Sequence, residues 1–127
     1  MVSRERGELI AELIDHLENQ GCATLRASGK EGNKNTPLPD VFTYGRKWLL
    51  AFNCEYALDD IAYFDIEKLG QLLKFSQLVG ARPRVAVKYE SVGWKLHHPG
   101  ELIVTPAQNY RVGPSLIDRG VSIEALG

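Results

Sequence analysis

Residues 37–55 read PLPDVFTYGRKWLLAFNCE, and this stretch decides the fold of the chain. Apolar and aromatic residues at 41–44 and again at 48–52 flank a Gly-Arg pair, a pattern typical of two strands joined by a tight turn. The carboxylate of Asp40 stands at the start of the first strand, and residues 53–55, Asn-Cys-Glu, stand where the second strand ends. The turn is therefore expected to bring one acid from each strand to the same end of the pair.

This layout resembles the core of the PD-(D/E)xK nucleases. In that core an Asp at a strand start and a Glu-x-Lys at the end of the next strand hold a divalent metal against a phosphate. Mg²⁺ prefers hard oxygen ligands, and the reaction needs a cation or base beside the attacking water. In this chain the three positions are Asp40, Asn53 and Glu55. The resemblance implies a restriction-endonuclease-like core whose site has been altered.

The composition is that of an ordinary globular protein. The 127 residues (14.2 kDa) predict a single domain, 1–127, with 44% hydrophobic and 24% charged residues. The N-terminal residues carry no apolar signal region, and the longest apolar run, 48–52, is too short to span a membrane. Two cysteines without a CxxC spacing, Cys22 and Cys54, favour small buried hydrophobes in a cytoplasmic protein. The net charge of −1 argues against strong, unspecific binding to duplex DNA.

Hydrophobic periodicity predicts two helices. The first covers 3–20, where apolar residues recur at helical spacing and Gly21 marks the C-terminal stop. The second covers 66–79, with Asp65 as its N-cap and Gly80 after its last turn.

Further strands are predicted at 22–27, 84–89, 92–97 and 102–105. Segment 28–39 is rich in Gly, Asn and Pro and predicts a loop, while the tail, 106–127, is either loosely packed or helical from Pro114. The neighbours His97 and His98 point to opposite faces of a strand, so they are not expected to share a metal ion. This order of elements predicts an α/β fold with a central mixed β-sheet flanked by helices.

The chain up to about residue 119 resembles the archaeal Holliday junction resolvases. The shared, collinear features are the helix GELIAELIDHLENQG at 7–21, R-x-S-G at 26–29, Pro39-Asp40, Tyr63, the stretch LGQLLKFSQLVGARPRVAVKY at 69–89 and Val-Gly-Trp at 92–94. The resemblance implies a homodimeric, Mg²⁺-dependent endonuclease fold that acts on four-way DNA junctions.

The active-site positions implied by this resemblance are mostly altered. The catalytic Glu near the start of the first helix falls on Ile10, the Glu of Glu-x-Lys is Asn53, and its Lys is Glu55. Of four functional positions only Asp40 remains. We therefore expect no intact catalytic residue and no bound metal. Asp40 and Glu55 are the pair that would hold Mg²⁺ or Mn²⁺ if residual nuclease activity existed.

The surface implied by the family is altered as well. Where resolvases carry Lys and Arg after the Glu-x-Lys, this chain has Leu58, Asp59 and Asp60, and acids there repel a phosphate backbone. The residues expected to give weak DNA contacts are Arg26, Lys30, Lys34 and Lys95. The residues expected to form a dimer interface on the apolar side of the second helix are Leu72, Phe75 and Val79.

Three functions of different classes follow from these observations. The preferred hypothesis is a catalytically inactive resolvase-like protein that acts as a partner or regulator in DNA recombination, repair or replication, with at most weak binding to DNA junctions. Such a protein would form a homodimer or a heteromer with an active resolvase. The alternatives are a non-cleaving, structure-specific DNA-binding protein and a residual Mg²⁺- or Mn²⁺-dependent junction endonuclease. The preferred hypothesis requires no cofactor and no membrane.

Overall fold

The computed structural model of the chain describes residues 6–26, 38–45, 47–107 and 109–126. The helices are α1 (Arg6–Asn19) and α2 (Ile66–Val79), with 3₁₀ helices η1 (Pro99–Glu101), η2 (Pro114–Arg119) and η3 (Ile123–Leu126). The strands are β1 (Ala23–Arg26), β2 (Val41–Tyr44), β3 (Leu49–Ala57), β4 (Ala62–Asp65), β5 (Arg82–Tyr89), β6 (Gly93–His97), β7 (Ile103–Val104) and β8 (Asn109–Val112).

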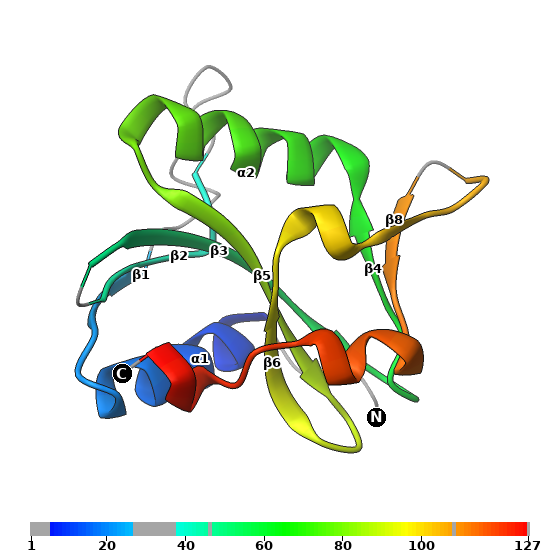
Figure 1. Cartoon of the computed structure of the whole chain (residues 1–127), viewed down its shortest axis with the longest axis horizontal. Helices are drawn as coiled ribbons and strands as arrows, with labels where there is room; N and C mark the ends of the chain where they lie inside the picture. The colour runs from blue at the N-terminus through cyan, green and yellow to red at the C-terminus, as the bar shows by residue number, and fades with distance from the viewer. Residues whose placement is uncertain (1–5, 27–37, 46, 108, 127) are drawn as a thin grey trace.

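A five-stranded mixed sheet, in the order β1-β2-β3-β5-β6, forms the centre of the fold. Its neighbours are antiparallel except β3 and β5, which run parallel because β4 and α2 form the crossover between them. The helix α1 covers one face of this sheet and α2 the other, while a second sheet, β4-β8-β7, lies beside α2 (Figure 1). The predicted α/β fold with a mixed sheet between helices is confirmed.

Two hydrophobic clusters fill the layers on either side of the central sheet. The α1-side cluster includes Leu13 and Leu17 of α1, Phe52 of β3 and Ile123 of the C-terminal segment. The α2-side cluster is made largely by α2, β3, β4 and β5. Because the sheet has apolar residues on both faces, β3 reads as a nearly continuous buried run rather than an alternating strand.

The boundaries of α2 follow from its capping residues. The Asp65 carboxylate accepts hydrogen bonds from the backbone N–H groups of Glu67, at 2.7 Å, and Lys68, at 3.4 Å. The helix ends at Gly80, whose φ of 74° lies in the left-handed region that glycine adopts without strain. The predicted span of 66–79 is confirmed.

The dimer interface predicted on α2 needs correction. Leu72 is 1% exposed and Phe75 is 8% exposed, and the Phe75 ring lies 4.9 Å from that of Phe42. Both side chains therefore pack inside the chain and are not available to a second subunit. Of the three predicted interface residues only Val79, at 45%, is exposed. The exposed apolar side chains on α2 are Ile66, Leu73, Leu78 and Val79.

Two other segments differ from the sequence-based predictions. β3 continues to Ala57, past its predicted end, because its residues pair in parallel with β5, which itself begins two residues earlier than predicted. The tail after residue 105 is not loosely packed: Leu116 is 6% exposed and Ile123 is 2% exposed. Its 3₁₀ helix from Pro114 agrees with the helical alternative. Within the described residues, no helix is long and apolar enough to cross a membrane.

Candidate functional site

Asp40 is fixed at the point where β2 enters the sheet. Its backbone N–H donates to the carbonyl of Phe52 at 2.8 Å, which continues the β2–β3 ladder by one residue. The residue as a whole is 7% exposed, and its side-chain Oδ2 accepts a hydrogen bond from the backbone N–H of Cys54 at 2.9 Å. The carboxylate is therefore held against β3 between Asn53 and Glu55, as the predicted hairpin requires.

The guanidinium of Arg6, the first described residue of α1, bridges the two acids of this site. Its Nη2 donates to Asp40 Oδ2 at 2.6 Å, and its Nη1 donates to Glu55 Oε2 at 3.2 Å. The side chains are 37% exposed for Arg6, 10% for Asp40 and 33% for Glu55. We call Arg6, Asp40, Asn53 and Glu55 the Asp40 site. A cation supplied by the chain lies between the two carboxylates that would hold a metal ion if residual nuclease activity existed.

Electrostatics tie these groups together. Burial acts to lower the pKa of Arg6, but Asp40 and Glu55 outweigh it, so that the pKa is raised and the guanidinium stays charged. Burial raises the pKa of Glu55, against the opposing effect of the Arg6 charge. Burial and the nearby Asp40 carboxylate raise the pKa of the Cys54 thiol, which therefore stays protonated and is no thiolate ligand.

The other two positions at which the family resemblance implies an acid, Ile10 and Asn53, carry uncharged side chains. Ile10 is 5% exposed and belongs to the α1-side cluster, so the helix position implied for a catalytic Glu is part of the hydrophobic core. Asn53 is 6% exposed, and the period of two places it on the same face of β3 as Glu55. Its amide oxygen is a weaker ligand for a hard cation than a carboxylate.

These residues do not fit a divalent metal ion. Asp40 Oδ2 already accepts two hydrogen bonds, and a cation placed between Asp40 and Glu55 would meet the positive guanidinium of Arg6. In the part of the chain that the structure describes, no group of three or more His, Cys, Asp or Glu side chains is placed to hold a metal. The structure thus joins Asp40 to Glu55 as predicted, but through Arg6.

Arg6 is the functional residue that the sequence analysis missed. It lies one helical turn before Ile10, at the i, i+4 spacing that puts two side chains on the same side of a helix. The sequence did offer a signal: a cationic residue lies one helical turn before the position at which the family resemblance implies an acid.

Of the residues predicted to contact DNA, the two that the structure describes, Arg26 and Lys95, lie on opposite edges of the central sheet. Arg26 lies at the end of β1 beside the start of α1, where its Nη2 would be 3.2 Å from a Cβ added to Gly7. Lys95 lies on β6, at the opposite edge of the central sheet from β1. Lys30 and Lys34 lie outside the described residues. Arg26 therefore lies next to the first turn of α1, far along the sheet from Lys95.

The two neighbouring histidines have separate structural partners. His97 is 1% exposed; its Nε2 lies 2.9 Å from the hydroxyl of Tyr89, and its Nδ1 lies 3.0 Å from Oε1 of Glu101. His98 is exposed, and its Nδ1 accepts from the N–H of Gly100 at 2.9 Å. They face different surroundings, as the sequence predicts.

Comparison with known proteins supports the same scaffold. The family model described as archaeal Holliday junction resolvase (Hjc) matches residues 2–127. The crossover junction endodeoxyribonuclease Hjc of Methanocaldococcus jannaschii is 28% identical over 99 residues, which are 78% of this chain and 68% of that protein. The solved structure of Archaeoglobus fulgidus Hjc, a Holliday junction resolvase, aligns with a TM-score of 0.84 at 23% identity, covering 94% of this chain and 95% of its own. The latter likeness shows the fold.

Proposed function

Since this chain belongs to the archaeal Holliday junction resolvase family, we propose that it is a non-cleaving member of that family. It acts as a partner or regulator in DNA recombination, repair or replication. It keeps the nuclease fold and has replaced the chemistry of the site. The related Methanocaldococcus jannaschii protein is named a crossover junction endodeoxyribonuclease.

The observation that carries the proposal is the guanidinium of Arg6 between Asp40 and Glu55. Metal-assisted hydrolysis needs a site that attracts a divalent cation and leaves coordination positions for water and a phosphate oxygen. Here both acids accept hydrogen bonds from one guanidinium, whose planar fork forms directional contacts to carboxylates. To seat Mg²⁺, the chain would first have to break both contacts and move Arg6 out of the site.

The position that would hold or activate the attacking water is also altered. By resemblance to the family it carries Lys, whereas here it carries Glu55, which is engaged by Arg6. A carboxylate at this position repels an incoming phosphodiester. Burial raises the pKa of Glu55, but a carboxyl group is either negative or neutral and cannot supply the positive charge of a lysine.

The direct test is a cleavage assay on a labelled four-way junction with Mg²⁺ or Mn²⁺. We expect no metal-dependent nicks from the wild-type chain, with the Methanocaldococcus jannaschii relative as the active reference. The Asp40→Asn variant, which keeps an oxygen for the Cys54 N–H, reveals contaminating nuclease. Metal-dependent nicking by wild type that Asp40→Asn lacks would refute the proposal in favour of a residual endonuclease.

Weak junction binding is proposed as a secondary property, because the exposed Arg26 lies at the end of β1 beside the first turn of α1. A gel-shift comparison of a four-way junction with linear duplex at two salt concentrations tests it. We expect weak retention of the junction that disappears at the higher salt concentration, since few phosphates are contacted. Equal and negligible retention of both DNAs would remove DNA binding from the proposal.

Assembly through α2 is proposed for the partner role. Leu73, Leu78 and Val79 are 44%, 70% and 45% exposed and supply the apolar surface for a homodimer or a heteromer with an active resolvase. In sedimentation, Leu78→Asp is expected to yield monomers from a dimeric wild type, because a charge at the interface is costly to desolvate. The Asn19→Asp variant, at an exposed position of α1, makes the same change of net charge away from α2 and controls for charge. A monomeric wild type that also fails to co-sediment with an active resolvase would exclude this interface.

A further inference from the structure

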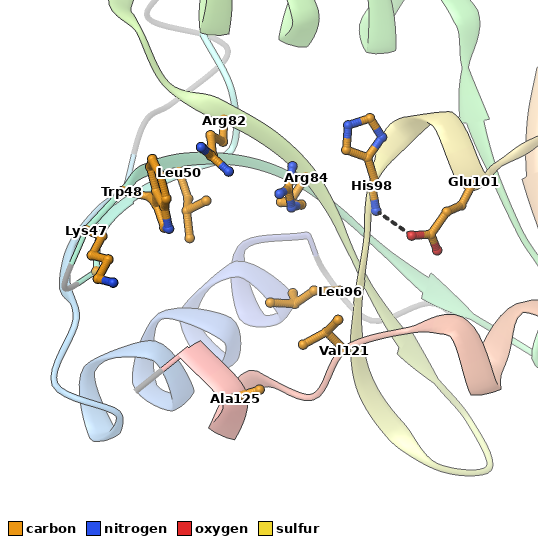
Figure 2. A pocket seen from close by; sticks show the side chains of 11 residues that line it. Lys47, Trp48, Leu50, Arg82, Arg84, Leu96, His98, Glu101, Val121 and Ala125 are labelled. Carbon is orange, nitrogen blue, oxygen red and sulfur yellow. Dashed lines mark hydrogen bonds between the residues drawn. The ribbon is translucent and has the colours of Figure 1, made fainter.

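A cavity of about 480 Å³ lies on the α1 side of the central sheet, at the opposite end of β3 from Glu55. It lies where β3 and β5 begin, where β6 ends and where the C-terminal segment returns to the sheet (Figure 2). The backbone of Val121 pairs with that of Leu96, donating at 2.9 Å and accepting at 2.8 Å, and this pairing fixes one wall. We call this cavity the Trp48 pocket. Its volume is that of a small-molecule site.

The pocket carries excess positive charge in a chain whose net charge is −1. Its lining includes the cations Lys47, Arg82 and Arg84 and a single carboxylate, Glu101. Glu101 is engaged elsewhere, because its Oε1 lies 3.0 Å from a ring nitrogen of the buried His97. Among the described residues, no carboxylate lies within ion-pairing distance of the three cations. Three cations against one carboxylate leave the cavity with excess positive charge, which attracts an anion.

The two arginines of this pocket are held close together by β5. Their positions, Arg82 and Arg84, are two residues apart on one strand, so their side chains leave the same face of the sheet. Burial and the charge of Arg82 lower the pKa of Arg84, which means that its charged form is destabilised in the unliganded pocket. A phosphate group placed between the two guanidinium groups would relieve this repulsion and match their fork-shaped donor geometry.

An aromatic ring and an apolar floor lie beside the cations. The Arg82 guanidinium carbon lies 3.3 Å from the centroid of the Trp48 ring, and Trp48 remains 48% exposed (Figure 2). Leu50, Leu96 and Val121 line the adjacent wall. A bare inorganic anion would leave the tryptophan and this apolar surface unused. A ligand with a planar ring attached to a phosphate would use both.

We infer that the Trp48 pocket binds a nucleotide, with its phosphate on Arg82 and Arg84 and its base against Trp48. Stacking of a base on an aromatic side chain is energetically favourable and tolerant of base identity. Two ligands carry a base next to a terminal phosphate: a free nucleoside monophosphate and the 5′-phosphorylated end of a DNA strand. The inference does not rest on the proposed function, because the pocket lies at the start of β3, the Asp40 site lies at residues 53 and 55 of that strand, and the two share no residue.

Trp48 itself supplies the readout. The chain has two tryptophans, so a Trp94→Phe background makes the fluorescence report on Trp48 alone. The probes are deoxyadenosine monophosphate, deoxyadenosine, inorganic phosphate, and a short single-stranded oligonucleotide with and without a 5′-phosphate. We expect saturable quenching by the monophosphate, with deoxyadenosine and phosphate each at least tenfold weaker. Calorimetry on the wild-type chain measures the dissociation constant of the monophosphate without the Trp94 change, and we expect the same value.

Variants then locate the site. Arg84→Gln is expected to weaken the monophosphate about tenfold to a hundredfold, the usual range for loss of a charge-assisted hydrogen bond, and Trp48→Leu to weaken it without any change of net charge. Lys74→Gln removes an equal charge from the exposed surface of α2 and is expected to leave binding unchanged. Tighter binding of the 5′-phosphorylated oligonucleotide than of the monophosphate identifies a DNA end as the source, and the reverse identifies a free nucleotide. The inference is overturned if no probe saturates, or if Lys74→Gln weakens binding as much as Arg84→Gln.

Discussion

Replacing Arg6 with methionine separates the charge of this residue from its bulk. Methionine keeps most of the side-chain length, and its helix propensity is close to that of arginine. The change leaves Asp40 and Glu55 facing each other without the guanidinium that bridges them. If Arg6 is the counter-charge of the Asp40 site, the variant loses stability and gains affinity for divalent cations.

The size of the loss follows from the two contacts. The bond to Asp40 is 2.6 Å long and its acceptor side chain is 10% exposed, whereas the bond to Glu55 is 3.2 Å long and its acceptor is 33% exposed. A hydrogen bond to a charged group contributes about 1.5–3 kcal/mol, and an exposed ion pair contributes about 0–1 kcal/mol. Because the Arg6 side chain is itself 37% exposed, we expect the low end of that sum. A loss of about 2 kcal/mol lowers Tm by roughly 8 °C for a chain of this size.

The assay is thermal unfolding, first with a chelator and then with Mg²⁺ or Mn²⁺. An ion present at ten times its Kd stabilises the folded state by about 1.4 kcal/mol, so the metal is expected to restore most of the lost Tm in Arg6→Met. The double variant Arg6→Met/Asp40→Asn should lose this response, since its remaining acid is Glu55. Lys74→Met, on the exposed face of α2, controls for removal of one positive charge and is expected to change stability by less than about 0.5 kcal/mol.

Two results would contradict this reasoning. One is an Arg6→Met variant as stable as the wild type, which would mean that the bridge contributes nothing in solution. The other is a wild-type chain that gains as much Tm from Mn²⁺ as the variant does, which would mean that the ion displaces the guanidinium without difficulty.

Three further predictions concern the core and the buried titratable groups. Phe75→Ala is expected to lower the free energy of unfolding in urea by about 3–5 kcal/mol, and the exposed Leu78→Ala by less than about 0.5 kcal/mol; equal effects would place Phe75 at the surface. Burial raises the pKa of Tyr89 to about 12, so the folded state keeps a proton that the unfolded state releases near pH 10. Stability should therefore fall as pH rises from about 10 to 12, and Tyr89→Phe should flatten that fall; a wild-type slope equal to that of Tyr89→Phe would disprove it. The Cys54 thiol, 0% exposed and with a raised pKa, should react with a thiol reagent at pH 8 only after denaturant is added, and rapid reaction of the native chain would show that the site opens.

Local signals were enough to predict the parts of the fold that depend on neighbouring residues. The limits of α2 follow from a carboxylate that caps its first turn and a glycine that adopts positive φ after its last, and both are readable within a few positions. The turn at Gly45 and the strands on either side follow from similar short-range chemistry. The length of β3 could not be predicted in this way. Asn53 and Glu55 look like the end of a strand, and their inclusion depends on pairing with Val85 and Val87 of β5, some thirty residues further along the chain.

The same distinction applies to the Asp40 site. The hairpin register predicts that Asp40 lies near residues 53–55, and the hydrogen bond from the Cys54 N–H shows that it does. The i, i+4 spacing to Ile10 indicates the side of α1 on which Arg6 lies, but its contact with Asp40 depends on how the first turn of α1 docks against that hairpin. The wrong interface assignment of Phe75 has a similar cause. A wide apolar surface on a helix does not reveal how much of it the chain's own sheet will cover, and here the ring packs against Phe42.

The Asp40 carboxylate has a structural reason to remain even where no metal is held. It accepts the Cys54 N–H and stands where β2 joins β3, so replacing it with an apolar residue would leave a buried backbone donor without a partner. A retained buried carboxylate must be neutralised or paired. In this chain the guanidinium of Arg6, reaching from α1, is the positive partner of Asp40. Under the proposed function this pairing balances the local charge and leaves the site with little attraction for a second cation. A substitution of Asp40 alone would therefore mainly report on the stability of the β2–β3 hairpin. A substitution of Arg6 would mainly report on the affinity of the site for a divalent cation.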